Sequence, residues 1–280
     1  MKKFLKKYYL YLILAILLIL SVVVFFNIYR NTNKTNTEVV NLDTKKTNTN
    51  MPVIDKVSEY TVPILMYHYI RVAPVGDTMG QDLSVTPTLF DSQVKWFSDN
   101  GYATIKMSDL ADTDKKAISL AISQKKKPIV FTFDDGYDDA YTQAMPILQK
   151  YGFTGTFYII RNYVGKPEYL TKAQIDKMSD AGMEIGSHTL SHPDLKTASE
   201  ETQRKQIFES KEQSTSFCYP AGKFSDLTVS LVKEALYTTA VTTVEAVSSE
   251  KSDLFKLPRV RVKNISAEAL ANKINNDPVK

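Results

Sequence analysis

The sequence predicts an α/β domain whose parallel strands form either a closed barrel or an open sheet. From residue 59 onward, short apolar runs alternate with segments of helical periodicity, a pattern typical of parallel strands covered by helices. His68, Asp134 and His188 each directly follow one of these runs, and in a barrel of this kind the functional groups lie where the strands end. No G-x-G-x-x-G follows the first run, so a dinucleotide-binding sheet lacks its fingerprint.

The predicted strands and helices alternate along the chain. The apolar runs expected to be strands are 62–67, 129–133, 156–160, 183–187, 217–219, 240–242 and 257–260. Helices are expected after the capping residues Thr86, Thr171, Ser199 and Ser266, and over roughly 139–151 and 225–236. The helix that follows Ser199 is expected to reach Glu212, and glycines end three of the others, at Gly101, Gly152 and Gly182.

The N-terminal segment predicts a membrane anchor. Residues 8–28 are apolar apart from Ser21 and Asn27, and about 20 such residues span a bilayer as a helix. The tail 1–7 is basic, which predicts that it stays in the cytoplasm while the remainder is exported. A cleavable signal peptide is the alternative, but its apolar core is usually shorter and is followed by a small-residue cleavage site. We therefore expect an uncleaved, single-pass signal-anchor in the cell membrane.

A polar linker is expected between the anchor and the main domain. Residues 29–58 are rich in Asn, Thr and Lys, so too few apolar groups are present to form a core. The first 50 residues hold eight Lys and Arg against two acids, which leaves 27 basic and 29 acidic residues in 51–280. The domain 59–280 is therefore near neutral, and no nucleic-acid partner is expected. Its single cysteine, Cys218, cannot form an internal disulfide.

Two short runs supply a complete set of metal ligands. His188 and His192 are four residues apart, a spacing that places both side chains on one face of a helical turn. Asp134 and Asp135 end a wholly apolar run, where a buried carboxylate costs free energy unless it has a partner. Two histidines and one carboxylate form a facial set that suits zinc, iron, cobalt or nickel and leaves positions open for water and substrate.

The two adjacent carboxylates are expected to divide their roles, because successive side chains cannot easily face the same ion. One of Asp134 and Asp135 would bind the metal, and the other would accept a proton from the attacking water. The residues alone leave open which does which. The combination predicts metal-assisted hydrolysis.

The runs 132–136 and 188–193 resemble the first two motifs of the polysaccharide deacetylases, carbohydrate esterase family four. The resemblance covers roughly residues 60–265 and implies a distorted (β/α)7 barrel. It also implies that Asp134 is the general base and that Asp135, His188 and His192 bind one divalent metal ion. Zinc is the expected metal, with cobalt or nickel as alternatives.

The third motif of that family, Arg-x-Pro-x-Gly, is altered in this chain. Residues 218–222 correspond to it, and Cys218 replaces the arginine that orients the base in the family. Another cation is expected beside Asp134, because an unpaired buried carboxylate would have a raised pKa. Arg259 is the candidate and Arg261 the alternative. The backbone N–H of Tyr219 resembles the family's second donor to the oxyanion.

The late Leu-x-His motif, which supplies the general acid in the family, has no counterpart after His192. His68 instead follows the strand-like run 63–67. This arrangement resembles the opening segment of the deacetylases that act on poly-N-acetylglucosamine. The resemblance therefore implies that His68 protonates the leaving amine. Tyr69 and Tyr137 are candidates for stacking against sugars.

The resulting hypothesis is a membrane-anchored, metal-dependent enzyme with an extracellular catalytic domain. It would remove N-acetyl groups from a polysaccharide that contains N-acetylglucosamine, such as peptidoglycan or an exopolysaccharide, and release acetate. An O-acetyl esterase of the xylan type is an alternative that would use the same machinery. A non-catalytic surface glycan-binding protein is another, and it predicts a broken ligand set.

Overall fold

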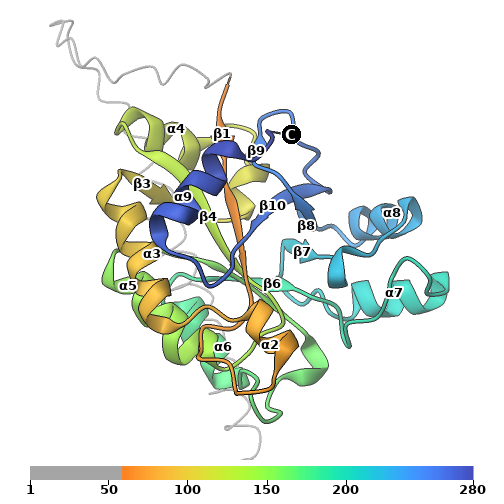
Figure 1. The fold of residues 1–280 in the computed structure, drawn as a ribbon. Helices are drawn as coiled ribbons and strands as arrows, with labels where there is room; N and C mark the ends of the chain where they lie inside the picture. Colours follow the sequence, from red (N-terminus) through yellow and green to blue (C-terminus); the bar gives the residue numbers. More distant parts are fainter. Residues whose placement is uncertain (1–58, 280) are drawn as a thin grey trace, which may run out of the picture. The chain divides into compact units, whose positions relative to one another are not determined.

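Parallel strands close into a barrel in the computed structural model, which describes residues 59–279 (Figure 1). In their order around the barrel, the strands are β2 (Ile64–Tyr67), β10 (Leu257–Arg261), β8 (Thr239–Glu245), β7 (Ser216–Cys218), β6 (Glu184–Ser187), β5 (Thr156–Ile159) and β4 (Lys127–Phe133). Parallel pairing of β2 with β4, for example Leu65 opposite Phe131, closes the ring. The predicted parallel strands are therefore confirmed, and of the two arrangements left open it is the barrel that forms.

Shorter strands lie outside this ring. β3 (Tyr102–Thr104) pairs with the first half of β4, and β1 (Thr61–Val62) pairs antiparallel with β9 (Ser248–Ser249). The single strand expected over 62–67 is instead β1 and β2, separated by Pro63, which has no N–H to donate to a neighbouring strand. Sequence patterns did not indicate β3, nor the helices α2 (Thr78–Leu83) and α4 (Lys116–Ser123).

The main helices cover the outside of the barrel and begin where their caps predicted. They are α3 (Pro87–Asp99), α6 (Lys172–Asp180), α7 (Glu200–Phe208), α8 (Asp226–Glu234) and α9 (Ala267–Asn276). The preceding Thr or Ser side chain accepts a backbone N–H of the first turn in each of them, which satisfies a donor that the helix itself cannot. Figure 1 shows α3 on one side of the barrel and α7 with α8 on the opposite side.

Two predicted helices differ from the structure. The helix expected over 139–151 is a π-helical turn, η2 (Ala140–Ala144), followed by α5 (Met145–Lys150). The helix expected to reach Glu212 ends at Phe208, and Glu212 then has a positive φ of 42°. A left-handed residue reverses the chain direction, so the helix cannot continue through it.

Alternation along β4 decides which side chains enter the barrel. Ile129, Phe131 and Phe133 pack into the outer core beneath the helices, whereas Val130 belongs to the cluster inside the barrel. Successive side chains of a strand point to opposite faces, so Thr132 and Asp134 share the inner face with Val130. A carboxylate is thereby carried to the inner rim at the end of β4.

The predicted anchor and linker, 1–58, lie outside the described residues. No helix within 59–279 has both the length and the apolar character needed to cross a membrane.

Candidate metal centre and active site

The predicted site residues gather at the rim formed by the C-terminal ends of the strands. His68 follows β2, Asp134 and Asp135 follow β4, and His188 follows β6. The ends of three strands thus bring these side chains to one side of the barrel.

Arg259 is the cation beside Asp134. Its guanidinium binds the carboxylate through two hydrogen bonds of 2.7 Å, Nη1 to Oδ1 and Nη2 to Oδ2. The same group donates to Thr132 Oγ1 (3.0 Å) and to the Thr242 carbonyl (2.8 Å), so its orientation is fixed. Burial alone would raise the pKa of Asp134, but Arg259 holds it well below its usual range. Asp134 is therefore ionised and held rigidly.

Asp135 turns back toward the site because the backbone leaves the strand conformation there. Its φ is +74°, and that of Gly136 is +80°. Left-handed backbone is unfavourable for a residue with a Cβ, and a Cβ on Gly136 would also lie 3.1 Å from Ile159. Because of this tight turn, the carboxylates of Asp134 and Asp135 both lie on the same side of the barrel.

Asp135, His188 and His192 converge on one point. Asp135 Oδ1 lies 3.4 Å from His188 Nε2 and 3.7 Å from His192 Nε2. The two imidazole rings are 4.8 Å apart and nearly perpendicular. His188 is fully buried, whereas 34% of the His192 side chain is exposed. The predicted ligands are thus together, on a turn rather than on a helix.

The ring of His188 is oriented for metal binding. Its Nδ1–H donates to the Cys218 carbonyl at 2.8 Å, which leaves the Nε2 lone pair directed at Asp135. Such a hydrogen bond to the second nitrogen is the usual partner of a metal-binding histidine. The donor set therefore fits a divalent cation with two nitrogens and one oxygen.

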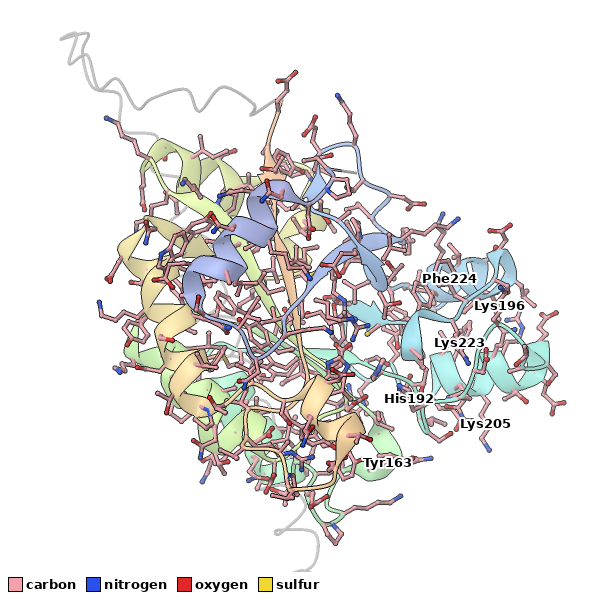
Figure 2. The ribbon with its side chains drawn as sticks, viewed as in Figure 1. Tyr163, His192, Lys196, Lys205, Lys223 and Phe224 are labelled. Atoms are coloured by element: carbon pink, nitrogen blue, oxygen red, sulfur yellow. The ribbon has the colours of Figure 1, made fainter. Side chains whose placement is uncertain are left out.

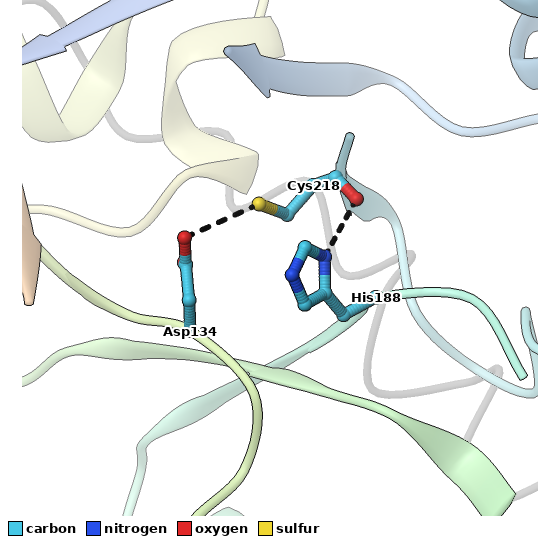
Figure 3. Close-up of side chains that lie close together, drawn as sticks. All are labelled: Asp134, His188 and Cys218. Atoms are coloured by element: carbon cyan, nitrogen blue, oxygen red, sulfur yellow. Dashed lines mark hydrogen bonds between the residues drawn. The ribbon is translucent and has the colours of Figure 1, made fainter. Parts of the chain in front are cut away.

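Within residues 59–279, a second group of side chains could also hold an ion: Asp134, His188 and Cys218. Figure 3 shows the Cys218 thiol directed at Asp134, and Cys218 Sγ lies 3.6 Å from Asp134 Oδ2. Both oxygens of Asp134 already bind Arg259, whose Nη2 lies 3.4 Å from the sulfur. A guanidinium in this position repels a cation, and the group is fully buried. We therefore favour Asp135, His188 and His192.

His68 lies beside the predicted base. Its Nε2 is 3.8 Å from Asp134 Oδ2, and 16% of the side chain is exposed. Burial lowers the pKa of His68, although Asp134 and Asp135 oppose the shift. A lowered pKa makes the protonated ring a stronger acid, and its partial exposure leaves it accessible from the rim.

The backbone N–H of Tyr219, the expected donor to the oxyanion, already has a hydrogen-bond acceptor in this structure. Its backbone N–H donates to the Val241 carbonyl at 3.2 Å, so the donor is used in the pairing of β7 with β8. Its hydroxyl donates to the Phe255 carbonyl. Resemblance to a motif located the residue but could not show that its N–H is already hydrogen-bonded.

The rim also contains residues that sequence reasoning missed. Asp139 is buried, and its Oδ2 accepts the backbone N–H of Ile70 (2.9 Å), two residues beyond His68. Tyr169 packs against Tyr137, and Tyr163 packs against Tyr169, in a cluster of aromatic rings. A second pair of acids close after Asp135 was the available signal for Asp139. Figure 2 labels Tyr163 and His192; their segments are linked because the backbone N–H of Asn162 donates to the Leu190 carbonyl at 2.9 Å.

The chain is similar to proteins that share this fold and site. Residues 121–240 match the family model for polysaccharide deacetylase. The chain is 35% identical over 213 residues to YxkH of Bacillus subtilis, which is named as a polysaccharide deacetylase, and the match covers 72% of this chain and 71% of YxkH. It is 24% identical to the poly-beta-1,6-N-acetyl-D-glucosamine N-deacetylase of Staphylococcus epidermidis, over 74% of this chain and 80% of that protein.

One solved structure matches this chain over nearly the whole length of the solved protein. The Streptococcus pyogenes deacetylase PplD, solved in complex with acetate, superposes with a TM-score of 0.69 and 31% sequence identity. The match covers 78% of this chain and 99% of that chain.

Proposed function

The chain belongs to the polysaccharide deacetylase family, and from that premise we propose that it removes N-acetyl groups from an extracellular glycan containing N-acetylglucosamine. The chain is therefore a polysaccharide deacetylase, which is a hydrolase that acts on carbon–nitrogen bonds other than peptide bonds. The observation that carries the proposal is the convergence of Asp135, His188 and His192 beside an ionised Asp134.

Asp135, His188 and His192 would hold one divalent cation, and we propose zinc because two imidazoles and a carboxylate are typical of catalytic zinc sites. When bound, the ion supplies a Lewis acid for the acetyl oxygen and acidifies water.

Asp134 is the proposed general base. Its carboxylate accepts a proton from the water that attacks the acetamide carbon, and the two hydrogen bonds from Arg259 hold it ionised and aimed. His68 donates a proton to the nitrogen as the carbon–nitrogen bond breaks. The 3.8 Å between His68 Nε2 and Asp134 Oδ2 then allows the proton gained by Asp134 to return to His68, so the protons balance over one turnover. Acetic acid, which ionises to acetate and a proton, and a free amine leave.

The names of two relatives support an amino-sugar polymer as the substrate. The Staphylococcus epidermidis relative is named for poly-beta-1,6-N-acetyl-D-glucosamine. A Bacillus cereus relative, 30% identical over 132 residues, is a peptidoglycan-N-acetylglucosamine deacetylase. Both names contain N-acetylglucosamine, so we propose a polymer of this amino sugar as the substrate.

The proposed location rests on the sequence before residue 59. A basic tail 1–7, a membrane-spanning segment 8–28 and a linker 29–58 would hold the catalytic domain outside a cell membrane. Fractionation of cells that make the full-length protein tests this: we expect full-length protein in the membrane fraction, accessible to external protease. Full-length protein found only in the medium would contradict it.

Acetate release by the full-length protein tests the proposed reaction. We expect release from N-acetylglucosamine oligosaccharides, loss of release with excess EDTA and recovery with added zinc. Release from acetylated xylan but not from the amino sugar would instead establish an O-acetyl esterase. Asp135→Asn is the matched variant, because it keeps the shape of the side chain but removes the ligand charge.

A further inference from the structure

Four tyrosines from three separate loops meet at the rim near the metal ligands. Tyr69 follows β2, Tyr137 follows β4, and Tyr163 and Tyr169 follow β5. We call these residues, with Arg71, the tyrosine stack. The Tyr69 and Tyr137 rings are 3.7 Å apart and nearly parallel, and Tyr169 follows at 5.1 Å from Tyr137.

The faces of these rings are covered, which contradicts the expectation that Tyr69 and Tyr137 stack on sugars. The Arg71 guanidinium lies 3.5 Å above the Tyr69 ring, and Tyr137 covers the other face. Tyr137 in turn is flanked by Tyr69 and Tyr169. The edges of the tyrosine rings, rather than their faces, are therefore available to a ligand.

Those edges carry hydroxyl groups on loops that also carry the site residues. Tyr69 directly follows His68, and Tyr137 is two residues beyond Asp135. The backbone of Tyr137 pairs with that of Tyr169 in an antiparallel bridge. Each of the three side chains is half-buried rather than enclosed.

The stack is held in place independently of any ligand. Asp139 Oδ2 accepts the N–H of Ile70, and the Tyr69 backbone exchanges hydrogen bonds with Leu83 and Val85. Arg71 is paired with Asp77 at 3.3 Å. The hydroxyl groups are thus fixed in position before a ligand arrives, which lowers the entropic cost of binding.

We propose that the hydroxyl groups of Tyr69, Tyr137 and Tyr169 form a subsite that hydrogen-bonds a sugar residue of the glycan beside the metal ligands. The ligand class is an uncharged pyranose with hydroxyl and acetamide groups, since protonated phenols both donate and accept hydrogen bonds. This inference rests on the proposed function, because it takes the substrate to be an amino-sugar polymer.

Phenylalanine substitutions test the subsite, because Tyr69→Phe, Tyr137→Phe and Tyr169→Phe remove the hydroxyls and keep the stacked rings. Tyr151→Phe is the matched control: its hydroxyl binds Asp91 in the outer helical layer. Binding of a β-1,4-linked N-acetylglucosamine pentasaccharide to full-length protein is measured by calorimetry. Hydrolysis of 4-methylumbelliferyl acetate, a small ester without a sugar, is measured in parallel.

We expect each rim variant to bind the pentasaccharide roughly three- to tenfold more weakly, as for the loss of one hydrogen bond. The control variant should stay at wild-type levels in both assays, and ester hydrolysis by the rim variants should fall less than their pentasaccharide binding. Unchanged pentasaccharide binding in all three variants would overturn the inference, as would an equal loss of ester hydrolysis, or no binding by the wild type. Failure of the proposed function gives a different result, in which the wild type binds the pentasaccharide and cleaves the ester but releases no acetate from the glycan.

Discussion

The two halves of the proposed active site differ in how the chain builds them. The metal half, Asp135, His188 and His192, comes from the ends of β4 and β6 and lies within two short sequence runs. The proton-transfer half joins Asp134 to Arg259 on β10 and to His68 after β2, residues separated by 125 and 66 positions. The difference teaches that the metal half joins two strand ends, whereas the proton-transfer half also needs β2 and β10, which pair where the ring of strands closes. Variants should therefore separate metal content from turnover.

The largest effect is expected from His188→Ala, which removes a metal ligand. We expect the purified full-length protein to lose its zinc and to release acetate at least about 10³-fold more slowly, because both the Lewis acid and the activated water are lost. Metal analysis and an acetate assay check this. Full activity with no zinc bound would contradict the role of the metal half.

His68→Asn should reduce turnover without removing the metal. Loss of a general acid typically costs 10²- to 10⁴-fold, and the cost falls on substrates whose leaving group must be protonated. We expect a fall of about 10²-fold or more for the acetamide and little change for 4-methylumbelliferyl acetate, because its leaving phenol is already weakly basic. Equal losses on both substrates would show that His68 is not the acid.

Arg259→Met should retain zinc and lose both rate and stability. Asp134 would then be a buried carboxylate without a partner, which typically costs about 3–5 kcal/mol of unfolding free energy. We expect turnover to fall by roughly 10²-fold, since the base is no longer oriented. The double variant Asp134→Asn/Arg259→Met should recover stability but not activity. If Arg259→Met instead lost its zinc, the two halves would not be separable.

The smallest effect on turnover is expected from Asp139→Asn, which keeps an oxygen to accept the Ile70 N–H. Burial raises the pKa of Asp139 to about 7. The neutral carboxyl therefore stabilises the folded protein at low pH, and this contribution to the free energy of unfolding is lost as pH rises through about 7. The variant should match the wild type near pH 4 and have the higher melting temperature near pH 8. Thermal unfolding at both pH values checks this, and a less stable variant at pH 8 would contradict it.

The same contrast explains what could be predicted from the sequence. Asp134, Asp135, His188 and His192 could be named from the sequence because each pair lies within one short run after a strand. Arg259 could be named only by asking what must neutralise a buried Asp134, and the structure places it there. The tyrosine stack and the engaged N–H of Tyr219 depend on packing between distant loops and strands, which no local pattern encodes.

Zinc-edge X-ray absorption on the full-length protein loaded with one zinc tests the central claim most directly. The account predicts only nitrogen and oxygen neighbours at about 2.0–2.2 Å, from His188, His192, Asp135 and solvent. A sulfur neighbour at about 2.3 Å would contradict it, because the ion would then lie between Asp134, His188 and Cys218, and Asp134 could not act as the base.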